Sequence, residues 1–178
     1  ENEAGDGVEE LLAAEFFSKQ LALYWPAGGD WTNAAGIRRR VLDDTLGAPF
    51  DLQLVDLNGD GRRDLLVTDD ANRSAVYAYE IPRAIRTDAW PRHLLANGFK
   101  TLVPGPGQAS PGRGIAFHPR VGARSKPLIL LSGDGAEFAY LLKPLSQNAS
   151  DWRYSTDAFL NLHGTVGEPL VADLNGDG

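Results

Sequence analysis

A nine-residue acidic stretch is the part of this sequence whose residue types and spacing suggest chemistry. It runs from residue 56 to residue 64 and has the pattern D-x-N-x-D-G-x-x-D. Oxygen-bearing side chains at alternate positions of a tight loop point inward together, and Ca²⁺ takes six to eight oxygen ligands. We expect ligands from the side chains of Asp56, Asn58 and Asp60, completed by the carbonyl of Arg62 and the carboxylate of Asp64. The loop therefore predicts a calcium site, and Mg²⁺ fits less well because it demands a tight octahedron and keeps its waters.

Weaker copies of this stretch occur elsewhere in the chain. Residues 173–178 repeat residues 56–61 identically, so Asp173, Asn175 and Asp177 are candidate ligands of a second calcium site. Residues 2–10 are an eroded copy in which Ala4 replaces a ligand, and the stretch near residues 119–127 has lost its acids. We expect little calcium binding at residues 2–10 and none at residues 119–127.

Two other interpretations of the 56–64 stretch compete with calcium binding in a β-hairpin. An EF-hand loop needs a bidentate Glu at its twelfth position and a helix on each side. The twelfth residue here is Val67, inside an apolar run typical of a strand, so the EF-hand interpretation fails. A metal-free Asp-Gly turn remains open as the simpler alternative.

The elements that must position this loop follow from an internal repeat. Aromatic, proline-ended stretches recur roughly every 60 residues, each preceded by an apolar run and followed by a tryptophan. The stretches are 21–26, 76–82 and 138–144, the apolar runs are 11–14, 65–67 and 128–131, and the tryptophans are Trp31, Trp90 and Trp152. The approximate repeats are therefore 1–55, 56–118 and 119–172, with the start of a fourth at 173–178.

Each repeat contains short strand patterns. Apolar residues alternate with polar ones over 50–54, and the patterns of 65–68 and 75–81 predict a buried inner strand and an aromatic strand. Residues 37–42 predict an outer strand. Four short strands per unit of this length are typical of a β-propeller blade, so we expect an all-β fold of about three four-stranded antiparallel blades. Residues 8–17 contain strong helix formers, but the repeat favours two strands and a turn there, which we expect.

The stretch 56–67, DLNGDGRRDLLV, resembles the FG-GAP/VCBS repeat of secreted and cell-surface β-propellers, including those of integrin α-subunits. The resemblance covers essentially the whole chain as three degenerate blades, with one complete motif. It implies that the chain is part of a roughly seven-bladed propeller, and that calcium binds in the inner hairpin at the five residues named above. It also implies an extracellular, secreted or cell-surface location and a structural, adhesion or ligand-binding role.

Composition excludes several other classes of function. The 178 residues include no Cys, so no disulfide, thiol nucleophile or CxxC zinc site is possible. The net charge of −7 argues against a nucleic-acid partner, and no apolar run approaches the ~20 residues of a membrane span. The chain also lacks Met, so we expect a processed form or a fragment, completed by the remainder of a longer chain or by self-assembly.

No recognisable constellation for catalysis accompanies the repeats. His93, His118 and His163 have no metal-binding spacing, and no GxSxG sequence occurs, so we expect no catalytic residues and no enzyme activity. The recurring tryptophans favour packing between blades over stacking on sugar rings. The alternatives left open are a carbohydrate-binding or carbohydrate-active propeller and a subunit of an extracellular polymer; the protein or glycan ligand is unknown.

Two sequons predict N-glycosylation if the source is eukaryotic. They begin at Asn72 and Asn148, both in predicted loops.

Overall fold

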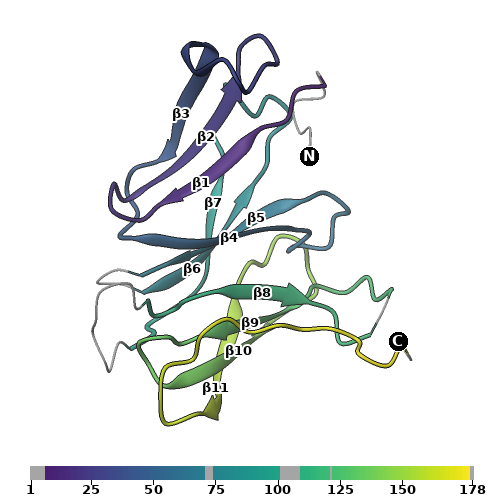
Figure 1. Cartoon of the computed structure of the whole chain (residues 1–178). Coiled ribbons are helices and arrows are strands. Elements are labelled where there is room, and N and C mark those ends of the chain that lie inside the picture. The colour runs from purple at the N-terminus through teal and green to yellow at the C-terminus, as the bar shows by residue number, and fades with distance from the viewer. Residues whose placement is uncertain (1–6, 71–73, 101–108, 121, 177–178) are drawn as a thin grey trace.

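The computed structural model describes residues 7–70, 74–100, 109–120 and 122–176. Within these ranges the chain forms strands β1 to β11 and a single 3₁₀ turn, Ala34–Gly36. All strand pairs are antiparallel, and the strands form three separate sheets (Figure 1). The predicted all-β fold class is confirmed.

Sheet 1 has three strands in the order β1-β2-β3. They are β1 (Leu11–Glu15), β2 (Gln20–Pro26) and β3 (Ile37–Asp43). The helix-like stretch 8–17 therefore contains one strand followed by a turn, where the repeat predicted two strands. Antiparallel pairing of β1 with β2 overrides the local helix propensity.

Sheets 2 and 3 each have four strands. Sheet 2 contains β4 (Pro49–Val55), β5 (Asp64–Asp69), β6 (Ala75–Glu80) and β7 (Arg92–Asn97), in chain order. Sheet 3 contains β8 (Gly114–Phe117), β9 (Leu128–Ser132), β10 (Phe138–Pro144) and β11 (Tyr154–Asn161), also in chain order. The first acidic loop joins β4 to β5.

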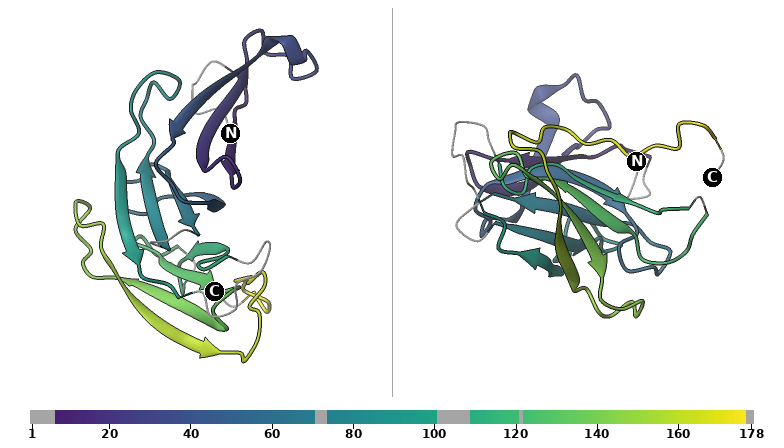
Figure 2. Two further views of the ribbon diagram at one scale, coloured as in Figure 1. Left: turned by 90° about the vertical axis from the view of Figure 1, so that its left-hand side faces the viewer. Right: turned by 90° about the horizontal axis from the view of Figure 1, so that it is seen from below.

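The three sheets follow one another along an arc, and they do not close into a ring (Figure 2). The first strands of neighbouring sheets contact each other, β1 with β4 and β4 with β8. Sheet 1 lies at one end of the arc, and the C-terminal segment runs along sheet 3 at the other end (Figure 1).

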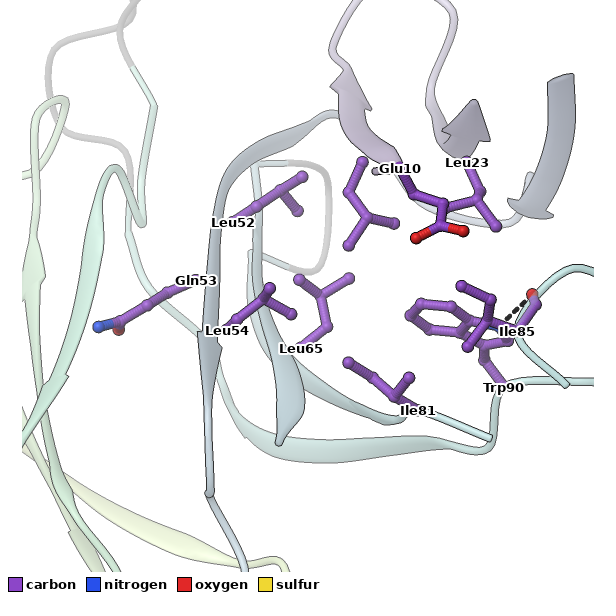
Figure 3. Close-up of a pocket in the computed structure, with 10 residues that line it drawn as sticks. Glu10, Leu23, Leu52, Gln53, Leu54, Leu65, Ile81, Ile85 and Trp90 are labelled. Atoms are coloured by element: carbon purple, nitrogen blue, oxygen red, sulfur yellow. Dashed lines mark hydrogen bonds between the residues drawn. The ribbon is translucent and has the colours of Figure 1, made fainter. Parts of the chain in front are cut away.

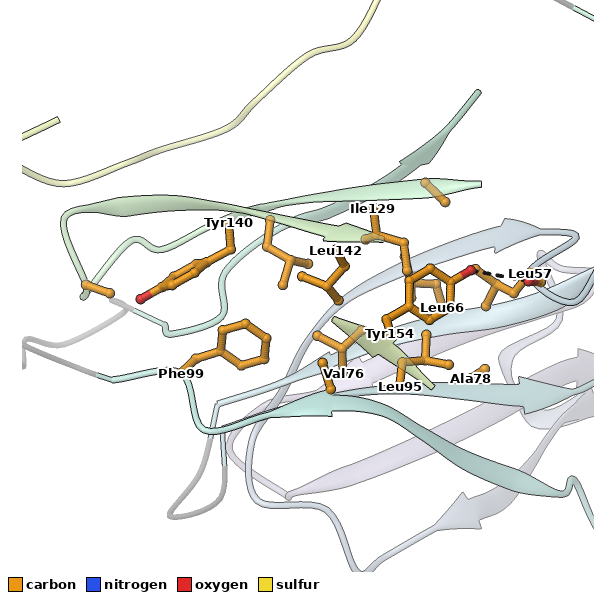
Figure 4. Close-up of a cluster of buried hydrophobic side chains, with 14 residues drawn as sticks. Leu57, Leu66, Val76, Ala78, Leu95, Phe99, Ile129, Tyr140, Leu142 and Tyr154 are labelled. Atoms are coloured by element: carbon orange, nitrogen blue, oxygen red, sulfur yellow. Dashed lines mark hydrogen bonds between the residues drawn. The ribbon is translucent and has the colours of Figure 1, made fainter. Parts of the chain in front are cut away.

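Two hydrophobic cores join the sheets. One lies between sheets 1 and 2 and includes Leu23, Leu65, Val67 and Trp90. The other lies between sheets 2 and 3 (Figure 4). All six residues of β5 are buried because its two faces point into these two cores.

Three of the four tryptophans pack in these cores. Trp90 is buried in the core between sheets 1 and 2, Trp25 packs against that core, and Trp152 packs against the core between sheets 2 and 3. The packing interpretation is confirmed for them, whereas Trp31 is exposed.

Candidate calcium loop

The β4–β5 connection holds the first acidic loop against sheet 3. Leu57 is fully buried in the core between sheets 2 and 3, and its amide donates to the Asp64 carboxylate at 3.0 Å. The Tyr154 hydroxyl of sheet 3 donates to the Leu57 carbonyl at 3.3 Å (Figure 4). The loop is thus fixed at both its start and its end.

The Asp56 carboxylate organises the loop backbone. Its Oδ1 accepts the amides of Gly59 at 2.7 Å and Asp60 at 3.2 Å, and its Oδ2 accepts the amide of Gly61 at 2.8 Å. Gly59 and Gly61 have φ values of 80° and 85°, which favour glycine. The glycines of the motif therefore allow the chain to fold around Asp56.

Asn58 and Asp60 extend the same network. The Asn58 side-chain carbonyl accepts the Asp60 amide at 2.9 Å, and Asp60 Oδ1 accepts the Arg62 amide at 2.8 Å. The Asn58 side-chain amide donates to Asp60 Oδ2 at 3.1 Å. The Arg62 side chain instead leaves the loop and donates to the Ile81 carbonyl at 2.8 Å. The side chains of Asn58 and Asp60 are thus in direct contact, whereas the Asp56 side chain contacts the backbone of the same loop.

Asp64 is the buried carboxylate of the loop, with 3% of the residue exposed. Burial raises its pKa to about 7; the Leu57 amide opposes this shift, and the negative charges of Asp60, Asp56 and Glu80 add to it. The negative charges around Asp64 make this end of the loop a region of negative potential. A cation would relieve that repulsion.

The donor set fits a hard cation because the loop offers carboxylate, amide and backbone oxygens and no nitrogen or sulfur ligand. Nevertheless, no group of three or more His, Cys, Asp or Glu among the described residues is arranged to hold a metal ion. The oxygens of Asp56 and Asp60 accept hydrogen bonds from loop amides instead. Calcium binding at this loop stays a prediction.

The second acidic loop repeats the first turn of this geometry. Asp173 Oδ1 accepts the Gly176 amide at 2.8 Å, as Asp56 does from Gly59, and Gly176 has a φ of 73°. Asn175 is exposed beside it, and Asp177 lies outside the described residues. Most of the eroded copy at residues 2–10, including Ala4, also lies outside them.

Of the two sequons, the one at Asn148 lies among the described residues. Asn72 lies outside the described residues. Asn148 is exposed in the loop between β10 and β11, and its side-chain carbonyl accepts the amide and hydroxyl of Ser150.

Two aspartates outside the acidic loops, Asp69 and Asp43, hold other parts of the fold together. Asp69 is buried and accepts the amides of Gly47 and Ala48. Asp43 accepts hydrogen bonds from Thr45, from the Tyr79 hydroxyl at 2.8 Å and from Arg92 at 2.8 Å. Most of these partners lie far along the chain, so no local sequence signal identifies them.

A polar cleft of about 330 Å³ lies where sheets 2 and 3 meet the C-terminal segment. Asp51, Arg113, Asp134 and Glu168 line it, and Arg113 forms an ion pair with Glu168. None of the three histidines lines it; His93 stacks on Trp152 with ring centroids 4.3 Å apart.

The comparisons with known proteins add nothing to these observations: no family model, curated protein or solved structure matches this chain. In the part of the chain that the structure describes, no helix has the length and apolar character to cross a membrane.

Proposed function

We propose that the chain is a non-catalytic, calcium-binding β-propeller module of an extracellular or cell-surface protein, with a structural, adhesion or ligand-binding role. The observation that carries the proposal is the loop at 56–64, where hydrogen bonds link Asp56, Asn58 and Asp60 close to the buried Asp64. The arc of three antiparallel sheets is compatible with consecutive blades of a larger ring.

Calcium would act structurally in this proposal. The loop connects the first two strands of sheet 2 and contacts sheet 3 through Leu57 and Tyr154. A bound ion would neutralise the carboxylates and hold the hairpin against the next sheet.

Calorimetric titration with Ca²⁺ tests the proposal. The variant Asp60→Asn keeps the side-chain size and removes one charge, so calcium affinity should fall by at least the ~10–100-fold that outer-shell changes cost at metal sites. Asp44→Asn, an exposed aspartate outside the loop, is the matched control and should bind like the wild type. Equal binding by wild type and Asp60→Asn, or no binding by the wild type, would contradict the calcium site.

A second candidate function is carbohydrate binding in the cleft beside Asp51. Its volume of about 330 Å³ lies within the range of small-ligand pockets, and its carboxylates and Arg113 can hydrogen-bond to hydroxyl groups. A glycan array with the wild type and Asp134→Ala tests it; binding lost in the variant supports this candidate, and no binding by the wild type excludes it.

A further inference from the structure

The polar cleft between sheets 2 and 3 lies at the opposite end of β4 from the acidic loop. Phe50 and Asp51, near the start of the strand, line the cleft, whereas the loop follows Val55 at its end. β4 has seven residues, which at ~3.3 Å per residue separate its two ends by roughly 20 Å. A ligand of the cleft is therefore held by residues that the calcium loop does not use.

Alternation along β4 directs Asp51 toward sheet 3. Leu52 points toward an apolar cavity between sheets 1 and 2, whereas Gln53 points away from that cavity (Figure 3). Asp51 shares the face of Gln53, because successive side chains of a strand alternate. The Gln53 side-chain carbonyl accepts the Ala116 amide at 2.7 Å, and Asp51 Oδ2 accepts the Gly114 amide at 2.9 Å. These hydrogen bonds fix the Asp51 carboxylate between the two sheets.

Backbone hydrogen bonds fix the wall that sheet 3 contributes. Ser132 is buried at the end of β9, and its Oγ accepts the Arg113 amide at 2.7 Å. The Ser132 amide donates to the Arg113 carbonyl at 2.9 Å, and the Ser132 carbonyl accepts the Gly112 amide at 2.7 Å. The cleft is thus preformed, as small-molecule sites usually are.

The charges that line the cleft favour a cation. The Arg113 guanidinium is neutralised by its ion pair with Glu168. Asp134 is half-buried in the turn after β9, and within the described part of the chain its carboxylate has no hydrogen bond or ion pair. Asp51 uses only Oδ2 for the Gly114 amide. Two carboxylates therefore line the cleft without a positive partner among the described residues.

Phe50 adds an aromatic surface to the same cleft. The residue is 38% exposed, and Phe16 packs edge-on against it with ring centroids 6.2 Å apart. An aromatic face attracts a cation and also offers a flat apolar surface to a sugar ring. An aromatic ring beside two carboxylates suits a ligand that combines a ring with a positive charge.

We propose that the polar cleft binds an amino sugar, whose ring lies against Phe50 and whose ammonium group donates to Asp51 and Asp134. This proposal rests on the carbohydrate-binding candidate function above and specifies the charge of the sugar. A neutral sugar would leave both carboxylates without a counter-charge, and an acidic sugar would be repelled by them. The volume of about 330 Å³ is at the small end of ligand pockets, which favours a sugar unit over a folded partner.

The first test compares two oligosaccharides with the same backbone by calorimetric titration. A glucosamine tetramer, at a pH where its amines are protonated, should bind at least ~10-fold more tightly than its N-acetylated counterpart, because its hydrogen bonds are charge-assisted. Asp134→Asn should lose most of this preference, and Phe50→Ala should weaken the binding of both oligomers. Asp44→Asn and Phe159→Ala change exposed residues of the same types outside the cleft and should bind like the wild type.

The outcomes separate this proposal from glycan binding in general. Equal binding of the two oligomers that is weakened in Asp134→Asn keeps a glycan in the cleft and overturns the preference for an amino sugar. No binding of either oligomer overturns both. Binding of the glucosamine tetramer that is unchanged in Asp134→Asn and Phe50→Ala also overturns the proposal, because it reports attraction of a cation to a chain of net charge −7.

The second test separates the cleft from the acidic loop, which also attracts cations. Asp60→Asn should bind the glucosamine tetramer like the wild type; a loss in this variant but not in Asp134→Asn places the cation at the loop and overturns the proposal. A lysine tetrapeptide carries side-chain ammonium groups without sugar rings and should compete at least ~10-fold more weakly. Equal competition shows that charge alone is recognised and overturns the sugar. Both titrations are run with a chelator, so the cleft and the calcium site can fail separately.

Discussion

At the scale of single residues, Asp43 joins two sheets through its carboxylate. It lies at the end of β3 and accepts hydrogen bonds from Tyr79 of β6 and Arg92 of β7. Burial tends to raise the pKa of Asp43, but the hydrogen bonds from Thr45 and Tyr79 and the positive charge of Arg92 outweigh it and hold the pKa below its usual value. The ionised form is therefore favoured in the folded chain.

We predict that Asp43→Asn lowers the free energy of unfolding by about 1.5–3 kcal/mol at neutral pH, the usual contribution of a hydrogen bond to a charged group. Because the folded pKa is depressed, this contribution is fully present above the unfolded value of ~3.9 and is lost as the pH falls through the folded pKa. Urea denaturation between pH 7 and pH 3 measures it. The difference in unfolding free energy between the wild type and Asp43→Asn should narrow below about pH 4. A difference that does not change with pH, or an equal loss of stability in Asp44→Asn, would refute this role of the Asp43 carboxylate.

Gly133 lies at a position where neighbouring atoms leave no room for a side chain. A Cβ at this position would lie 2.2 Å from the Phe138 carbonyl oxygen and 2.9 Å from the Tyr140 ring. The first contact is with backbone, which cannot move aside without disturbing β10. We predict that Gly133→Ala destabilises the chain by about 1–3 kcal/mol.

The control for Gly133 is Gly167→Ala. A Cβ on Gly167 would meet nothing within 4 Å, so this change should leave stability unchanged or raise it by less than about 1 kcal/mol. Thermal unfolding of both variants measures the difference. Equal unfolding midpoints for Gly133→Ala and Gly167→Ala would contradict the steric clash expected at Gly133.

At the scale of elements, β5 is held between two cores. Leu65 and Val67 point toward sheet 1, and Leu66 points toward sheet 3. We predict that Leu66→Ala costs about 2–5 kcal/mol in unfolding free energy, because it leaves a cavity between sheets 2 and 3. Leu94→Ala, at a half-exposed position of β7 in the same sheet, should cost less than about 1 kcal/mol. Similar denaturation midpoints for the two variants would contradict this account of β5.

The strands were predictable where alternation or an apolar run is strong. The outer strand at 37–42 and the strands at 50–54, 65–68 and 75–81 all appear at those places. The local turn around Asp56 was also predictable, because its hydrogen bonds join residues at most five positions apart. The Asp43 network was not, because it joins sheet 1 to sheet 2 and depends on how those sheets pack. The ion pair between Glu10, just before β1, and Arg86, in the β6–β7 connection, depends on the same packing.

At the scale of the whole molecule, calcium and the arc of sheets are linked through one loop. Leu57 anchors the loop in the core between sheets 2 and 3, while Asp56, Asp60 and Asp64 carry its negative charge. Without a cation, the repulsion among these carboxylates opposes the packing of Leu57. An ion bound only by the folded loop stabilises the fold by mass action.

We therefore predict that Ca²⁺ at about 100 times its dissociation constant raises the free energy of unfolding by ~2.7 kcal/mol. Thermal unfolding at a fixed protein concentration, with calcium and with a chelator, measures the effect. For a chain of this size the midpoint should rise by about 2–4 °C per kcal/mol. Magnesium should raise the midpoint less, because it demands a near-ideal octahedron, whereas calcium accepts more oxygen ligands in a less regular arrangement. Asp60→Asn should lose most of the calcium response, whereas Asp44→Asn should keep it. An equal calcium response of the wild type and Asp60→Asn would place the ion outside the 56–64 loop.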